Sequence, residues 1–255
     1  QKKGFLDWFK KENPDILCLQ DFYHSISQKY PFITIEKIIK AGFPYFQIHY
    51  THTVADSNFW GIATFSKYPL IKGPVFEIDS IRGNAWIYSD ACIGKDTIRI
   101  FNLHGASVKL KHLDYVYIEK LLNEKKPDYR SHHKPGNEKI FEISQKVIKA
   151  MKYRQQQVDT LIKTIQQTPY PIILCCDLND IPNSYVYEKI THHLHDAYTT
   201  SGTNGGTTYL GPIPFLRIDY IFFTPHSLVN HSFHTLNYKL SDHKPITACF
   251  QIQSK

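Results

Sequence analysis

The chain has 255 residues, of which 42% are hydrophobic and 21% are charged, and its formal charge at pH 7 is +7. This composition excludes a disordered or fibrous protein, because enough apolar surface is present to build a core. No apolar run approaches the roughly 18 to 20 residues that span a bilayer, so the sequence predicts a soluble protein without a transmembrane segment.

Strands dominate the elements predicted for the N-terminal part of the chain. A short amphipathic helix is expected at residues 5–12, where Asn13 and Pro14 end it. The elements that follow are a strand at residues 16–19, a helix at 33–40, and strands at 45–50, 61–66, 85–91 and 98–103.

The C-terminal part mixes helices and strands. Residues 113–167 are helical in pattern, with a break near residues 126–136 that two prolines and a glycine cause. A buried-looking strand at 172–176, a helix at 185–190, and strands at 218–223 and 246–251 follow. This order predicts an α/β sandwich with helices outside paired sheets, and no linker rich in Pro, Gly or Ser divides it. We therefore expect one domain, residues 1–255.

Cysteine usage and charge distribution give weaker indications. The five cysteines are odd in number and lie in apolar runs without zinc-site spacing, so we expect buried free thiols. Residues 106–150 contain ten Lys or Arg against six Asp or Glu. A solvated surface is the simpler interpretation of this segment, and attraction of a polyanionic substrate is the alternative.

Polar residues stand repeatedly at the ends of the predicted strands. Taken singly, each has a structural explanation as a cap, an Asx-turn or a hydrogen-bonded histidine. Together they supply carboxylates, amides and histidines, a set that suits Mg²⁺ or Mn²⁺ and metal-assisted hydrolysis of a phosphate ester. The residues are Asp21, Asn102, His104, Asp177, Asn179, Asp219, Asp242 and His243.

The same residues lie in five ordered motifs. These resemble the motifs of the endonuclease/exonuclease/phosphatase superfamily, which has the deoxyribonuclease I-like fold, and the resemblance extends from near residue 5 to residue 251. It implies a four-layer sandwich of two facing mixed β-sheets flanked by helices, with the site where strand ends converge. The motifs are Leu17-Cys18-Leu19-Gln20-Asp21, Asn102-Leu103-His104, Asp177-Leu178-Asn179, Arg217-Ile218-Asp219-Tyr220 and Ser241-Asp242-His243-Lys244-Pro245.

The resemblance also implies roles for the acidic residues. Asp21 stands where the family usually has Glu, and it is expected to bind the metal together with Asp242. The side chain of Asp21 is one methylene shorter, so metal distance or affinity is expected to differ. Asp177 is expected to orient or deprotonate the attacking water, which Asn179 would hold.

The remaining residues are expected to contact the phosphate. His243 would bind the scissile phosphate while Asp219 fixes its tautomer and favours the imidazolium. His104 would stabilise a phosphate oxygen or protonate the leaving oxygen. Asn102 and Arg217 are expected to bind the substrate.

One part of the family pattern has no counterpart in the sequence. The family opens with a strand that precedes the helix expected at residues 5–12, and this first family strand is missing from the N-terminus. Removal of an interior strand would expose backbone groups and core. We therefore expect either a trimmed chain, derived from a longer secreted or membrane-anchored precursor, or a strand supplied by residues outside the sequence. The compartment stays open.

These observations predict a Mg²⁺-dependent phosphoesterase that uses activated water on a phosphodiester or phosphomonoester, with Mn²⁺ as the alternative ion. A nuclease-like substrate is favoured, and a monomer is expected. The alternatives are a catalytically weak binding or scaffold protein with the same fold, and a lipid phosphodiesterase of the sphingomyelinase type. Aromatic residues near the motifs are expected to stack on bases or line an apolar pocket, namely Phe22, Tyr23, Phe59, Trp60, Tyr185, Tyr209 and Phe215.

Overall fold

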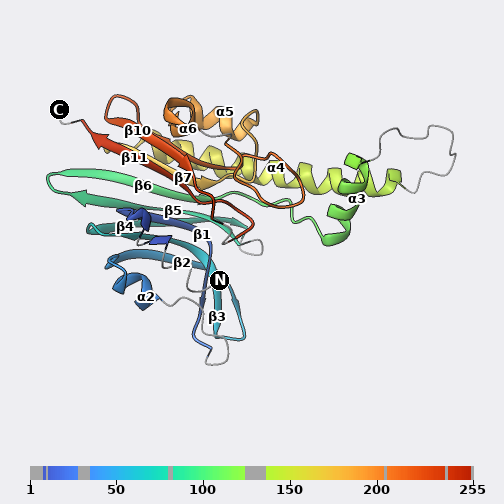
Figure 1. Cartoon of the computed structure of the whole chain (residues 1–255), viewed down its shortest axis with the longest axis horizontal. Helices are drawn as coiled ribbons and strands as arrows, with labels where there is room; N and C mark the ends of the chain where they lie inside the picture. The colour runs from blue at the N-terminus through green and yellow to red at the C-terminus, as the bar shows by residue number, and fades with distance from the viewer. Residues whose placement is uncertain are drawn as a thin grey trace.

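A six-stranded mixed sheet forms the centre of the fold in the computed structural model (Figure 1). The structure describes residues 8–9, 11–27, 35–79, 83–123, 136–203, 206–238 and 241–253. Strands β6 and β7 pair in parallel, and the other neighbours pair antiparallel. In spatial order the strands are β4 (Leu70–Asp79), β5 (Asn84–Ile93), β6 (Asp96–His104), β7 (Ile172–Asp177), β9 (Asp219–Phe223) and β8 (His195–Asp196).

Two antiparallel sheets face the central sheet. One has the order β1-β3-β2, and the other pairs β10 with β11. Between the layers, Ile98, Ile100 and Ile221 of the central sheet share an apolar cluster with Cys18 and Ala248 of the facing layer. This packing confirms the predicted sandwich of paired sheets. The facing strands are β1 (Ile16–Ser25), β2 (Tyr45–Val54), β3 (Asn58–Ser66), β10 (Leu228–Thr235) and β11 (Ile246–Ile252).

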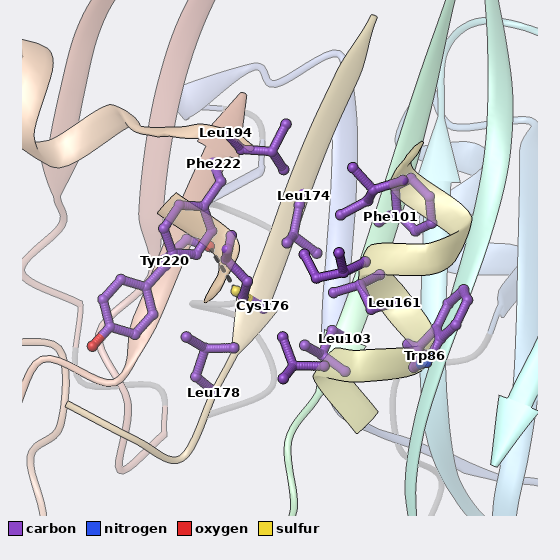
Figure 2. Packing of buried hydrophobic residues seen from close by; sticks show 14 of the residues in the cluster. Trp86, Phe101, Leu103, Leu161, Leu174, Cys176, Leu178, Leu194, Tyr220 and Phe222 are labelled. Atoms are coloured by element: carbon purple, nitrogen blue, oxygen red, sulfur yellow. Dashed lines mark hydrogen bonds between the residues drawn. The ribbon is translucent and has the colours of Figure 1, made fainter. Parts of the chain in front are cut away.

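Helices cover the outer faces of both layers. Helices α4 (Gly136–Gln166) and α5 (Tyr185–Thr191) pack on the central sheet, where Figure 2 shows Leu161 against Trp86 and Leu103. Helix α2 (Ile35–Lys40) packs its buried Ile38 on the other side, against the β1-β3-β2 sheet. Helix α6 (Ala197–Ser201) lies beside β9 and β10. The helical outer layers are therefore as predicted.

Helix α4 extends beyond the sheets. Its N-terminal part and α3 (His112–Asn123) form an arm that projects from the body (Figure 1). Asp114 of α3 binds Lys139 and Lys146 of α4 at 2.5 and 2.8 Å, which fastens the two helices together. No helix in the described ranges is long and apolar enough to cross a membrane.

The sequence-based expectations match most of these elements and miss four of them. Strand β4 was not predicted because Gly73 and Pro74 interrupt its apolar pattern, which an edge strand tolerates at a bulge. Strand β10 was not predicted because polar residues fill most of it, and the short β8 and α6 carry little pattern. Residues 8–9 and 11–12 of the first predicted helix are helical, and the rest of it lies outside the described residues. The five cysteines are free, as expected, but the expected burial holds only for Cys176, whereas Cys249 is exposed and the other three are half-buried.

The facing layer is open between its two sheets. Within the described ranges, β1 pairs only with β3 and β11 pairs only with β10. A cavity of about 730 Å³ lies between these strands, and Ile16, Cys18, Ile246 and Ala248 are among its apolar lining. The edges of β1 and β11 thus border this cavity. The absence of the first family strand is not tested by this geometry and stays a prediction.

Candidate active site

Three adjacent strands of the central sheet place three predicted site residues in one row. His104 ends β6 and pairs in register with Asp177, which ends β7. Asp177 pairs in turn with Asp219, which begins the antiparallel β9. Parallel strands end at the same edge of a sheet, and an antiparallel neighbour begins there. The last residues of β6 and β7 and the first residue of β9 therefore lie side by side. All three side chains are largely buried.

His243 joins this row from the segment before β11. Its Nδ1 lies 3.0 and 2.9 Å from the two carboxylate oxygens of Asp219, so the ring is held by a shared hydrogen bond. Burial disfavours the imidazolium, but the hydrogen bond and charge of Asp219 outweigh burial and raise the pKa of His243 to about 9. The His243 side chain is therefore cationic at neutral pH.

Thr208 fixes the two segments that carry this pair. Its Oγ1 accepts hydrogen bonds from the backbone N–H groups of Ile218 and Asp219, at 3.1 and 3.2 Å. Its carbonyl accepts from the N–H of Lys244 at 2.7 Å, one residue after His243. Thr208 is fully buried, and its role was not predicted because a single Thr in a loop carries no sequence pattern.

Asp177 and Asn179 form a tight polar turn after β7. The Asn179 backbone N–H donates to Asp177 Oδ1 at 2.8 Å, and the Asn179 side-chain amide donates to the carbonyl of Gly105 at 3.1 Å. Asn179 has a φ of 51°, in the left-handed region that Asn tolerates better than most residues. Burial raises the pKa of Asp177 to about 7, and the charge of Asp219 acts in the same direction.

Asp21 approaches the row from the facing layer. It lies at a bulge where the β1–β3 register shifts, with a φ of 47°, and its side chain is 78% exposed. His104 lies between the two acids, because its Nδ1 is 3.5 Å from Asp21 Oδ1 and its Nε2 is 3.7 Å from Asp177 Oδ2. The central sheet and the β1-β3-β2 sheet thus contribute to one site.

Helix α4 braces the loops that follow β6 and β7. Gln157 donates to the carbonyl of His104 at 3.2 Å and accepts from the N–H of Ala106 at 2.9 Å. Arg154 donates to Asp180 at 2.8 Å and to the carbonyl of Ala106 at 2.9 Å. The sequence analysis did not predict a role for either residue. An Arg and a Gln three positions apart on the buried face of a helix would have indicated polar contacts of this kind.

The loop after β6 also needs a small residue. A Cβ at Gly105 would lie 2.4 Å from the backbone oxygen of Leu178, so the loops after β6 and β7 approach each other only because residue 105 is glycine.

The structure places the remaining predicted residues at the margin of the row. Asn102 is fully buried beneath it, accepts from Gln20 at 2.6 Å and donates to the Ala63 carbonyl at 2.9 Å. Arg217 binds Asp196 at 2.6 Å. Their polar groups thus have protein partners, and the expected substrate contacts of both stay predictions.

Asp242 is exposed directly before His243, and its Oδ1 accepts from the Ser241 hydroxyl at 3.0 Å. Asp177, Asp219 and His243 offer ligand atoms that lie within 4.8 Å of one another, but the imidazolium of His243 has no lone pair for a metal, so the two carboxylates are the donors of this group. Buried like charges of this kind favour a bound cation, and oxygen donors fit a hard divalent ion. The donor set thus fits a metal, whereas the specific ligands Asp21 and Asp242 stay predictions.

The fold and this site define a phosphoric ester hydrolase. The sequence profile described as the Endonuclease/Exonuclease/phosphatase family matches residues 1–243, so the chain belongs to that family, whose members are such hydrolases. The match confirms the resemblance seen in the motifs. No curated protein matches the sequence.

Solved structures show the same fold at low sequence identity. The endonuclease/exonuclease/phosphatase from Beutenbergia cavernae has a TM-score of 0.67 and 14% identity over 99% of this chain, which spans only 66% of that chain. The human Nocturnin catalytic domain with bound sulfate has a TM-score of 0.62 and 16% identity, over 99% of this chain and 86% of that chain. A mannosyl-6-phosphatase from Bacteroides thetaiotaomicron has a TM-score of 0.60 and 13% identity, over 98% and 90%.

Proposed function

We propose that this protein is a Mg²⁺-dependent phosphoesterase that hydrolyses its substrate with an activated water, and that a nucleic acid is the favoured substrate. The observation that carries the proposal is the row of His104, Asp177 and Asp219 across three strands, completed by His243. In this proposal, the row supplies a base, a second buried acid and two histidines that can donate hydrogen bonds, all at one end of the central sheet.

Each side chain of the row has a role that its surroundings support. Asp177, with a pKa of about 7, is suited to accept the proton of an attacking water near neutral pH. The imidazolium of His243 is suited to stabilise the charge on a phosphate oxygen, because Asp219 keeps it protonated. His104, which lies between Asp21 and Asp177, is expected to donate to a second oxygen or to the leaving group.

Asp21 and Asp242 are the residues that we expect to hold the divalent ion, which is Mg²⁺ or alternatively Mn²⁺. When bound, the ion supplies positive charge that offsets the repulsion between water and a phosphoester anion. Asp21 lies beside His104, so the expected metal site adjoins the row.

A polyanionic substrate is supported by the arm next to the site. Tyr115 of α3 lies 3.4 Å from Tyr209, oxygen to oxygen, and the Tyr209 ring contacts the His243 ring at 5.4 Å between centroids. The arm belongs to the basic segment 106–150, of which residues 124–135 lie outside the described residues. Excess positive charge beside a site raises the local concentration of a polyanion.

The test is hydrolysis of a substrate panel with Mg²⁺, comprising single- and double-stranded nucleic acids, a choline phospholipid and soluble phosphate esters. Asp177→Ala and His243→Ala should each reduce metal-dependent hydrolysis by roughly 10²- to 10⁴-fold with unchanged circular dichroism. Asp159→Ala, an acid on α4 whose Oδ1 accepts from Tyr185, is the matched control and should retain activity. Full activity in both site variants would refute the proposal.

A further inference from the structure

Helix α4 keeps its apolar side beyond the end of the central sheet. Over the sheet, this side buries Val158 and Ile162 in the core cluster. Met151 precedes Val158 by 7 residues and Ile140 precedes it by 18, which are about 2 and 5 turns of an α-helix. Residues separated by whole turns lie on one side of a helix. The apolar side of α4 therefore continues from the body of the molecule into the arm.

In the arm, the side chains on this side of α4 are exposed. Ile140 and Met151 are each 48% exposed, whereas Val158 is fully buried. Ile148 stands three residues before Met151, so the two are neighbours on the helix surface. Phe141, about two turns before Ile148, is 65% exposed. We call the apolar residues of this surface the arm stripe, namely Ile140, Phe141, Val147, Ile148 and Met151.

The arm stripe lies past the end of the sheet that carries the candidate active site. Helix α4 ends shortly before β7 begins, so its N-terminal part projects past the end of β7 (Figure 1). Asp177 stands at that end of β7, and Arg154 of α4 reaches Asp180 in the loop that follows. A partner bound to the arm stripe would therefore lie next to the site.

Lysines border the arm stripe. Lys152 stands four residues after Ile148 and is exposed, as is Lys149 further round the helix. On the other border, Lys139 and Lys146 bind Asp114 of α3. A helix with one apolar side and lysines around it is typical of helices that lie in the interface of a membrane, with the lysines near the headgroups.

Charge and apolar surface together select the partner. Residues 106–150 contain ten Lys or Arg against six Asp or Glu, a surplus that attracts anionic headgroups, nucleic acids and other polyanions. A nucleic acid offers phosphates but little surface for aliphatic side chains such as Ile140 and Met151. A second copy of this chain offers apolar surface but carries the same positive surplus, which opposes association. Of these three partners, an anionic bilayer matches both features.

We propose that the arm docks on a bilayer that contains anionic phospholipids, with the arm stripe inserted at the headgroup boundary. Docking holds the site end of the central sheet close to the lipid surface. The inference goes beyond the proposed function, because docking requires no hydrolysis and is measured without it.

The first test is cosedimentation of the whole chain with vesicles of phosphatidylcholine and phosphatidylserine, and with vesicles of phosphatidylcholine alone. The chain should bind the anionic vesicles, and salt should weaken the binding. The double variant Ile140→Gln, Phe141→Gln should lower the partition coefficient by at least about tenfold, because two buried apolar side chains are lost. Ile71→Gln on β4, which removes a side chain that is 61% exposed, is the matched control and should bind like wild type.

The second test concerns the lysines. Lys149→Gln and Lys152→Gln should each lower binding to the anionic vesicles by about fivefold. Lys163→Gln, which changes an exposed lysine of the same helix where it packs over the sheet, should leave binding unchanged. Equal binding of the wild type to both kinds of vesicle would overturn the proposal.

Insertion of the arm stripe is measured by fluorescence. Phe141→Trp should show a blue shift of its emission when anionic vesicles are added, because the indole leaves water. Ile71→Trp should show no shift, and the three native tryptophans are common to both variants. Vesicle binding without a shift in Phe141→Trp would overturn insertion of the arm stripe.

The remaining outcomes separate the rival partners. No vesicle binding, or binding that Ile140→Gln, Phe141→Gln retains, would overturn the proposal. If that variant instead converts a dimer into a monomer, the partner is a second copy, and if the lysine variants weaken binding of an oligonucleotide but not of vesicles, it is a nucleic acid. Hydrolysis of a soluble phosphate ester should be unchanged in every arm variant. Vesicle binding by a chain that hydrolyses no phosphate ester would overturn the proposed function while docking stands.

Discussion

The Nδ1 atom of His243 lies 2.9 Å from Oδ2 of Asp219, although 24 residues separate them in the chain. The carboxylate belongs to β9 of the central sheet, whereas the histidine comes from the irregular segment before β11. The pair thus ties that segment to the sheet, and it keeps the imidazole charged.

This pair predicts how activity depends on pH. The pKa of His243, about 9, lies above the ordinary value of about 6.5, so the imidazolium persists at neutral pH and is lost as the pH rises through 9. If the imidazolium is needed, kcat/KM should fall on that alkaline limb. Asp219→Asn should move the limb toward about pH 6.5, and Asp159→Asn should leave it in place. An unmoved limb in Asp219→Asn would contradict this role.

Removal of the metal gives a second prediction. Chelation should abolish hydrolysis, and isothermal titration should detect saturable binding of Mg²⁺ or Mn²⁺. Asp21→Ala should lose this binding, whereas Asp56→Ala, an acid in the β2–β3 turn, should keep it. Absence of binding in the wild type would favour a scaffold over an enzyme. Restored or tightened binding in Asp21→Glu would show that one methylene limits the affinity.

The ion pair between Arg154 of α4 and Asp180 predicts that a change at Arg154 lowers the free energy of unfolding. Arg154 is almost fully buried and holds the largely buried Asp180, so Arg154→Met should destabilise the protein by about 3 kcal/mol, because a buried charge is left unpaired. Urea denaturation measures this change. Lys152→Met on the exposed side of the same helix should change stability little. The double variant with Asp180→Asn should recover part of the loss, and no recovery would argue against the ion pair as its source.

The ion pairs between α3 and α4 predict that the arm becomes less stable in acid. The Lys139 and Lys146 hydrogen bonds hold the pKa of Asp114 far below its usual range. A lowered folded-state pKa means that this contact stabilises the arm above the unfolded value of about 3.9 and weakens as the pH falls below it. The protection factors of the α3 amides, which are corrected for the slower intrinsic exchange at low pH, should therefore fall in acid. Asp114→Asn should exchange fast at pH 7 already, unlike Glu119→Gln, and equal rates would contradict the prediction.

The cavity between β1 and β11 predicts that an added strand would stabilise the protein. Trp8 and Glu12 line the cavity, so a strand joined to the N-terminus through a linker of suitable length can be designed to reach it. A strand that pairs with both edges should protect the backbone amides of β1 and β11 from exchange and raise the melting temperature. An extension with the same composition in scrambled order is the control. Equal protection and melting temperature for both would contradict strand addition.

Much of the fold and of the site was predictable because the signals are local. Short apolar runs that end in polar residues indicated β1, β6 and β7, and the residues Asp177 and His104 were found at their ends. The stretches that were missed lack such patterns: β4 contains a Gly-Pro pair at an edge, and Thr208 acts through backbone contacts that no single-residue pattern encodes.

The sequence by itself determined the class of fold, the family and the identity of the polar residues, because strand periodicity and ordered motifs depend only on neighbours in the chain. Tertiary structure alone decided which of those residues meet. It aligned His104, Asp177 and Asp219 through strand register, and on β1 it turned Tyr23 toward the central sheet while Phe22 went to the core. The reason for the second arrangement is the bulge at Asp21, since one extra residue reverses the face on which every later side chain of β1 lies.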